Sequence, residues 1–103
     1  MNRVFRFEPE ASAELEDAAR WYNAQRSGLG VDFLEAVDAA LDQIARWRQL
    51  GRIVPGVPTD LPVRRFPVAR FPYHIAYLEW DGAIRVLALA HDRRLPGYWF
   101  SRV

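Results

Sequence analysis

The pattern of apolar positions is clearest between residues 31 and 51. Apolar residues recur there at the spacing of one face of a helix, at Phe33, Val37, Ala40, Leu41, Ile44 and Trp47. Gly51 is expected to end this helix. An earlier helix should begin at Pro9, because proline suits the first helical turn. Residues 27–30, Ser-Gly-Leu-Gly, should break it. The short break predicts a helical hairpin.

The remaining chain is typical of strands and turns. Residues 3–7 predict a short first strand, in which Val4 faces the side opposite Phe5 and Phe7. Residues 52–62 are rich in proline and are expected to form a loop. The segment 63–68 predicts a strand near an edge of the sheet, because Pro67 cannot donate a ladder hydrogen bond.

The strongest strand signals are two apolar runs, residues 71–80 and 83–91, on either side of Asp81-Gly82. Asp-Gly is a favoured two-residue turn of a β-hairpin. The predicted order is strand, helix, helix, strand, strand, strand. It indicates a single α+β domain over residues 1–103, with the helical hairpin packed on one face of a mainly antiparallel four-stranded sheet.

The hairpin turn also predicts which side chains share a face, provided that no bulge intervenes. Ile75 should then lie opposite Ala88, and His74 opposite Leu89. The face packed on the helices should contain Tyr73, Ile75, Tyr77, Ile84, Val86, Ala88 and Ala90. The other face should contain Arg70, His74, Ala76, Leu78, Arg85, Leu87, Leu89, His91 and Arg93. This second face is too apolar to be fully solvated, so either residues 96–103 or an external partner should cover it.

Charge is distributed unevenly along the chain although the net charge is only +1. Residues 1–42 contain four arginines and nine acidic residues, a net charge of −5, whereas residues 43–103 contain ten arginines and four acidic residues, a net charge of +6. All fourteen basic residues are arginine, whose planar guanidinium suits phosphate and carboxylate groups. The second half is therefore expected to meet an acidic or nucleic-acid partner.

Several classes of protein are disfavoured by what the sequence lacks. There is no cysteine for a disulfide framework, and no apolar run of the length of a membrane span or signal peptide. We therefore expect a cytoplasmic protein. There is no glycine-rich phosphate loop and no Gly-x-Ser-x-Gly motif, so nucleotide hydrolysis and serine hydrolase chemistry have no support, and no cofactor is expected. The spacing of His74 and His91 matches no zinc pattern, so no metal site is expected either.

Residues that could carry chemistry follow the last strand. His91 can act as a general acid or base near neutral pH, and Arg93 and Arg94 could stabilise developing negative charge on a phosphate. RNA cleavage by the 2′-hydroxyl needs those two functions and no metal. The alternative is structural, with the histidine bonded to backbone and the arginines paired with carboxylates. Tyr98 and Trp99 could stack a base, cover the sheet or bind a partner.

These residues fall into motifs that resemble the RelE/ParE superfamily, the toxins of type II toxin–antitoxin systems. The similarity covers the chain from about Phe7 to Trp99, through Ala11-Ser12-Ala13-Glu14-Leu15 with Trp21-Tyr22, Gly28-Leu29-Gly30 with Phe33 and Val37, Val63-Arg64-Arg65-Phe66, Arg70-Phe71-Pro72-Tyr73-x-Ile75-x-Tyr77, and His91-x-Arg93-Arg94-x-Pro96-x-Tyr98-Trp99.

The resemblance implies a growth-arresting toxin in a hetero-oligomer with a cognate antitoxin, expected to be of the ribbon-helix-helix type. The residues expected to bind this partner are Arg70, Arg85, Leu87, Leu89, Arg93, Arg94 and Trp99. The resemblance also implies one of two targets. RelE-like members cleave messenger RNA on the ribosome without a metal, whereas ParE-like members inhibit DNA gyrase.

Departures from the nuclease pattern favour the ParE-like branch. His74 and Asp92 stand where that pattern has arginines, and the chain has no lysine, although Tyr98 matches a catalytic tyrosine. The expectation is therefore a gyrase poison. A nuclease that uses His74, His91, Arg93 and Tyr98 remains an alternative. A third alternative is an inactive protein of the toxin fold that only binds its antitoxin.

Overall fold

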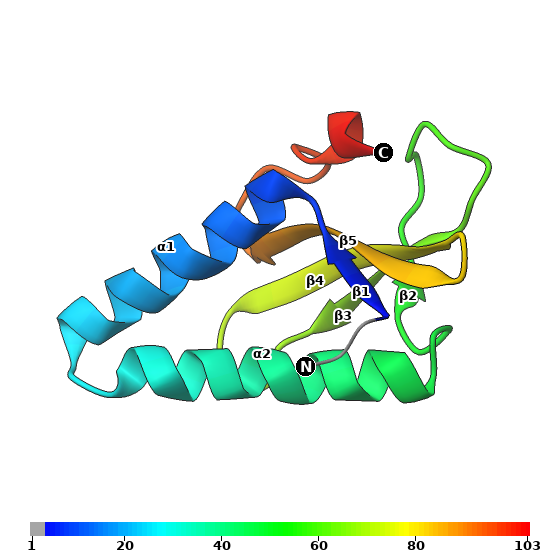
Figure 1. The fold of residues 1–103 in the computed structure, drawn as a ribbon. Coiled ribbons are helices and arrows are strands. Elements are labelled where there is room, and N and C mark those ends of the chain that lie inside the picture. The colour runs from blue at the N-terminus through cyan, green and yellow to red at the C-terminus, as the bar shows by residue number, and fades with distance from the viewer. Residues whose placement is uncertain (1–3) are drawn as a thin grey trace.

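A helical hairpin covers one face of a mixed β-sheet in the computed structural model, which describes residues 4–103 (Figure 1). The elements in chain order are β1 (Phe5–Phe7), α1 (Pro9–Gln25), α2 (Leu29–Arg46), β2 (Arg52–Ile53), β3 (Val63–Pro67), β4 (Tyr73–Trp80), β5 (Ala83–His91) and a 3-10 turn, η1 (Phe100–Arg102). The α+β class is confirmed. Arg3, which the first strand was expected to include, lies outside the described residues.

The first helix begins at Pro9 as predicted, whereas the second begins at Leu29, inside the predicted break of residues 27–30. Pro9 opens α1, and Gly28 has a φ of 91°, a left-handed conformation that favours glycine, just before α2. The second helix ends at Arg46, so the prediction that it extends to Gly51 was wrong. Its end is set by tertiary contacts, because the Gly51 amide instead donates to the buried Tyr77 hydroxyl at 2.9 Å. Within residues 4–103, neither helix is long and apolar enough to cross a membrane.

The sheet has five strands in the order β1-β5-β4-β3-β2. Only the β1–β5 pair is parallel, so the sheet is mainly antiparallel as expected. The fifth strand is β2, which lies in a segment expected to be a loop. Two residues are too few to show alternation in the sequence, and β2 is recognised only by its pairing with β3, where Arg52 lies opposite Arg65.

A β-bulge changes the register of the central hairpin. The predicted pairing holds from the turn as far as Tyr77 opposite Val86. Leu87 is then an extra residue, so Ile75 lies opposite Leu89 and not Ala88, and His74 lies opposite Ala90 and not Leu89. A shift of one residue moves every later side chain to the other face.

The bulge therefore corrects the predicted faces of β5 beyond Val86. Leu89 packs in the core beneath the helices, while Ala88 and Ala90 belong to the core on the opposite face. His91 pairs with Tyr73, and the two rings are in edge contact at a centroid distance of 5.0 Å. His91 thus shares the helix-facing side with Tyr73, contrary to expectation.

The opposite face of the sheet is covered by the chain's own C-terminal segment, one of the two coverings expected. The buried residues of this second core are Val63, Ala76, Leu78, Leu87, Ala88, Ala90 and Trp99. Trp99 is only 3% exposed, and Tyr98, Phe100 and Val103 pack beside it. The sheet consequently lies between α2 on one side and η1 on the other (Figure 1).

The close approach of the helices depends on Gly30. A Cβ atom at this position would lie 2.5 Å from the Ala19 carbonyl oxygen and 3.0 Å from the Asn23 Cβ. We predict that Gly30→Ala lowers the free energy of unfolding by about 1–3 kcal/mol, because the helices must separate. Urea denaturation measures this, with the exposed Ser27→Ala as control. Equal stabilities of the two variants would contradict the packing argument.

Candidate functional site

A groove of about 820 Å³ lies beside the C-terminal segment. Its walls come from residues 50–55 around β2, residues 65–67 of β3, and residues 94–100. His74, Ala90, His91 and Asp92 close one end. The groove thus gathers most of the titratable residues that the sequence singled out, together with the aromatic side chains of Tyr98 and Trp99.

The best-defined polar pair in the groove is His74 and Asp92. The His74 Nδ1 atom lies 2.9 Å from an Asp92 carboxylate oxygen, and His74 is 9% exposed. Burial lowers the pKa of His74, and Arg65 lowers it further, whereas the Asp92 carboxylate opposes this shift. Near neutral pH the ring is therefore a neutral imidazole whose Nδ1 donates to Asp92, so Nε2 carries the free lone pair.

Among the described residues, no hydrogen bond or ion pair joins His74 to His91, Arg93 or Arg94, although His91 and Arg94 line the same groove. The Arg93 amide donates to the His91 Nδ1 at 3.0 Å, which is the backbone-bonded alternative considered for this histidine. The Arg94 guanidinium lies 3.9 Å from the centre of the Tyr98 ring, a cation–π contact. Arg93 is exposed.

Tyr98 belongs to a hydrogen-bond network centred on Glu14 of α1. The Tyr98 hydroxyl donates to Glu14 Oε2 at 2.6 Å, and the Arg102 guanidinium binds both carboxylate oxygens at 2.9 and 3.1 Å. Burial, and then the hydrogen bond to Glu14, raise the pKa of Tyr98. This hydroxyl therefore stays protonated with its proton committed to Glu14.

The same network completes the open edge of β5. Pairing with β1 stops at Val86, whose carbonyl accepts from the Glu8 amide at 2.9 Å. Beyond it, the Leu87 carbonyl accepts from Arg102 at 3.0 Å and the Leu89 amide donates to Glu14 at 3.1 Å. Side chains thus satisfy backbone groups that no strand reaches.

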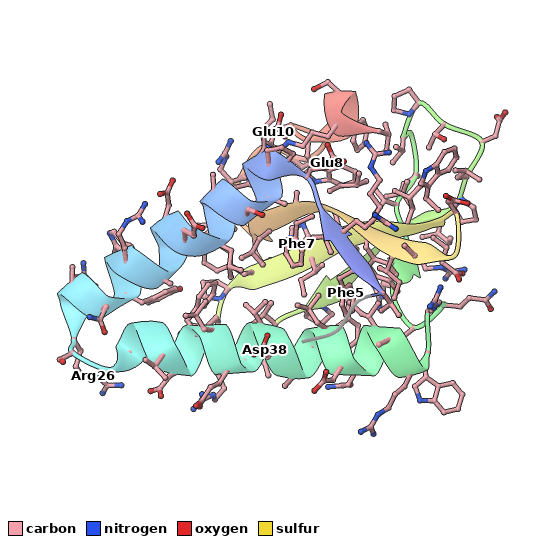
Figure 2. The ribbon with its side chains drawn as sticks, in the orientation of Figure 1. Phe5, Phe7, Glu8, Glu10, Arg26 and Asp38 are labelled. Carbon is pink, nitrogen blue, oxygen red and sulfur yellow. The ribbon has the colours of Figure 1, made fainter. Side chains whose placement is uncertain are left out.

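Four of the predicted partner-binding residues make contacts within the chain. Arg85 donates to Glu8 at 2.7 Å and to the Arg102 carbonyl at 2.6 Å, and Figure 2 shows Glu8 between β1 and α1. Leu87, Leu89 and Trp99 are buried in the two cores. A role for these four in partner binding stays a prediction. Leu87 and Trp99 could meet a partner only if the C-terminal segment moved, and Leu89 only if the helices moved.

The other three predicted partner-binding residues, Arg70, Arg93 and Arg94, are exposed. They lie at the end of the sheet where Tyr73 pairs with His91. Arg70 has a φ of 70°, in the turn before β4. Within residues 4–103, no group of three or more histidine or acidic side chains is arranged to hold a metal ion.

The residues that sequence reasoning missed are Glu14, Arg102 and the orienting Asp92. A partial signal existed, because Glu14 falls in the helical motif of the resemblance while Tyr98 falls in the last one. Nothing in the spacing of these two residues, 84 positions apart, indicates that they touch.

The Glu14 network yields a stability prediction. In Glu14→Gln the Arg102 guanidinium, whose side chain is 14% exposed, loses its counter-ion. We expect a loss of about 2–4 kcal/mol in the free energy of unfolding and faster hydrogen exchange at the Leu89 amide. Glu16→Gln, an exposed position of the same helix, is the control. Unchanged exchange at Leu89 in Glu14→Gln would contradict the proposed edge closure.

His74 yields a pH prediction. Its folded pKa is lowered by burial, so the unfolded chain binds a proton more readily than the folded chain. Its contribution to stability is complete above the unfolded pKa of about 6.5, and is lost as pH falls through the lower folded pKa. Relative to His74→Gln, the wild-type chain should lose stability between pH 7 and 5. Urea denaturation at several pH values tests this, and a constant difference would contradict it.

Comparisons with known proteins agree with this architecture. The family described as "ParE toxin of type II toxin-antitoxin system, parDE" matches residues 5–96. A chain of the solved structure described as "Chromosomal ParDE TA system from P. aeruginosa" has a TM-score of 0.58 and 20% sequence identity, over 85% of this chain and 94% of that one. No curated protein sequence matches significantly. Since the family match spans most of the sequence, the chain belongs to the ParE toxin family of type II toxin–antitoxin systems.

Proposed function

We propose that this toxin arrests growth by inhibiting DNA gyrase in the cytoplasm, and that it does not cleave RNA. Membership of the ParE family supports the first part, through the gyrase inhibition that the resemblance implies for ParE-like members. The state of Tyr98 is the observation that carries the second part. Its hydroxyl proton is held by Glu14, and Arg102 occupies the other side of the same carboxylate. Tyr98 is thus part of the scaffold and a poor general base.

Of the other candidate catalytic groups, His74 has no side-chain hydrogen bond to His91 or Arg93 over the described range of the chain, although His74 and His91 both line the groove. His91 lies on the helix-facing side with Tyr73, and its Nδ1 accepts the Arg93 amide. His74 projects from the opposite face. A nuclease needs its base, acid and charge-stabilising groups around one phosphate. Inhibition by binding needs no such arrangement.

A metal-independent ribonuclease is the second candidate because of the His74–Asp92 pair. An imidazole held by a carboxylate on one nitrogen is positioned to accept a proton on the other. Arg65 and Arg94 line the same groove and could contact a phosphate. The groove could therefore supply a general base and contacts to a phosphate, although Tyr98 would not supply the second group needed for proton transfer.

We further propose that a cognate antitoxin of the ribbon-helix-helix type neutralises the toxin in a hetero-oligomer. Arg70, Arg93 and Arg94 are exposed at one end of the sheet, beside the groove. They can bind an acidic antitoxin segment without unfolding the C-terminal turn. A chain that binds this antitoxin but leaves growth unaffected would be the inactive alternative.

Two assays, one on the purified toxin and one on cells that express it, test the choice of target. We expect inhibition of gyrase-catalysed supercoiling of relaxed plasmid, and no codon-phased cuts when RNA from arrested cells is mapped by primer extension. His74→Ala should inhibit gyrase as the wild-type chain does, because it removes only the possible base. Growth should recover when the antitoxin is co-expressed. Codon-phased cuts that disappear in His74→Ala, with gyrase unaffected, would instead establish the nuclease.

A further inference from the structure

An exposed surface at the end of α2 combines large apolar side chains with arginines. It consists of Arg46, Trp47, Arg48, Leu50, Arg52 and Ile53, and we call it the α2-end platform. Trp47 is 70% exposed, Ile53 53% and Leu50 41%. We propose that this platform is the surface through which the toxin binds its target protein. The segment of the target that it contacts is acidic and carries a large apolar side chain. The inference rests on the proposed function, inhibition by binding.

The platform is held rigidly although its side chains are exposed. The buried Tyr77 hydroxyl donates to the Arg48 carbonyl at 2.9 Å and accepts the Gly51 amide at 2.9 Å. The Arg64 guanidinium donates to the Gln49 and Gly51 carbonyls at 3.1 and 2.9 Å. Two side chains of the sheet are thus devoted to fixing this segment. A surface that is ordered before binding loses less entropy on association.

Gly51 adds a second constraint on the same backbone. A Cβ atom there would lie 2.8 Å from the Arg65 carbonyl and 2.9 Å from the Tyr77 hydroxyl. The segment is therefore pressed against β3 and β4, and Trp47 and Ile53 at its two ends cannot retreat into the core. Burial of these apolar side chains is available only through another molecule.

The charges of the platform favour an acidic occupant. Arg46 and Arg52 are exposed, and in the part of the chain that the structure describes neither forms an ion pair. Arg48 lies 3.5 Å from Glu79, the single acidic residue that lines the adjoining hollow of about 450 Å³. Trp47 and Leu50 form other walls of that hollow. An apolar side chain of the target segment could enter this hollow, while carboxylates beside it in the segment pair with Arg46 and Arg52.

The side-chain types favour a protein over a nucleic acid. Leu50 and Ile53 are aliphatic and offer no ring on which a base can stack. Tryptophan and arginine dominate the binding energy of protein interfaces. Arg48 donates to the Gly82 carbonyl in the turn at the end of the β4–β5 hairpin opposite Arg70, Arg93 and Arg94. The part of the platform formed by Arg46, Trp47 and Arg48 therefore lies away from the proposed antitoxin site, whereas Leu50, Arg52 and Ile53 also line the groove beside that site.

The helical hairpin provides a matched control for a mutational test. Trp21 is 59% exposed on α1, and Arg26 is an exposed arginine at the tip of the hairpin (Figure 2). The test variant is Trp47→Ala with Arg46→Glu, and the control is Trp21→Ala with Arg26→Glu. Each replaces one exposed tryptophan and reverses one exposed charge. Circular dichroism and thermal melts should show that both variants fold.

Three measurements on the purified or expressed full chain follow: growth after induction, gyrase supercoiling, and binding to the antitoxin. The platform variant should need at least about tenfold more protein for half-inhibition of supercoiling and should no longer arrest growth. Its antitoxin affinity should stay within about twofold of wild type. The control variant should behave as the wild-type chain in all three.

Several results would overturn the inference. One such result is a platform variant that arrests growth and inhibits gyrase as strongly as the wild-type chain. Another is a platform variant that stays toxic but no longer binds the antitoxin, because this result assigns the platform to the antitoxin. A DNA mobility shift by the wild-type chain that the variant lacks would assign it to nucleic acid. If the wild-type chain arrests growth without any effect on gyrase, the proposed target is contradicted. The growth assay of the platform variant would then still show whether the platform binds a different target.

Discussion

The carboxylate of Glu14 joins three parts of the chain that are far apart in the sequence. It receives hydrogen bonds from Tyr98 and Arg102 of the C-terminal segment and from the Leu89 amide of β5. A half-buried carboxylate is stable in its charged form only when such donors surround it. The position of α1, the closure of the sheet edge and the covering of the second core all depend on this one group.

The Glu14 network also explains why the groove is a permanent feature of the fold. Trp99 is buried against the sheet because Tyr98 and Arg102, on either side of it, are both bonded to α1. Arg85 adds a bond to the Arg102 carbonyl. The C-terminal segment therefore forms a wall at a fixed distance from β2 and β3. Because Tyr98 is held in this network, its hydroxyl is not free to take part in proton transfer.

Much of the fold could be predicted because its signals are local. The apolar stripe of α2, the proline that opens α1 and the Asp81-Gly82 turn each depend on residues close together in the sequence. The bulge at Leu87 could not be predicted, since residues 86–90 are all apolar and show no alternation that would reveal a change of face. Its backbone groups are satisfied by Arg102 and Glu14, and no local pattern reveals such distant partners. β2 escaped prediction for a related reason, because it exists only through pairing with β3.

The sequence predicted which part of the fold contains the candidate site, but it did not predict how the side chains of that site are arranged. Sequence reasoning selected His74, His91, Arg93 and Tyr98, and three of their positions do border or adjoin the groove. The relation among them depended on the register of β5, which the bulge changed. Asp92 had been noted as a departure from the nuclease pattern, and its role in orienting His74 became visible only in three dimensions.

The bonds between α1 and the C-terminal segment have a consequence for synthesis of the protein. Helix α1 emerges early from the ribosome, but the donors that complete its contact with β5, Tyr98 and Arg102, are translated more than 80 residues later. Contacts between such distant residues form late in folding, since the loop between them must first be ordered. A nascent chain that has not yet released these residues carries an open β5 edge and an uncovered apolar sheet face. During translation the chain thus exposes an unpaired strand edge and apolar surface, the features by which incomplete chains aggregate or are bound by chaperones.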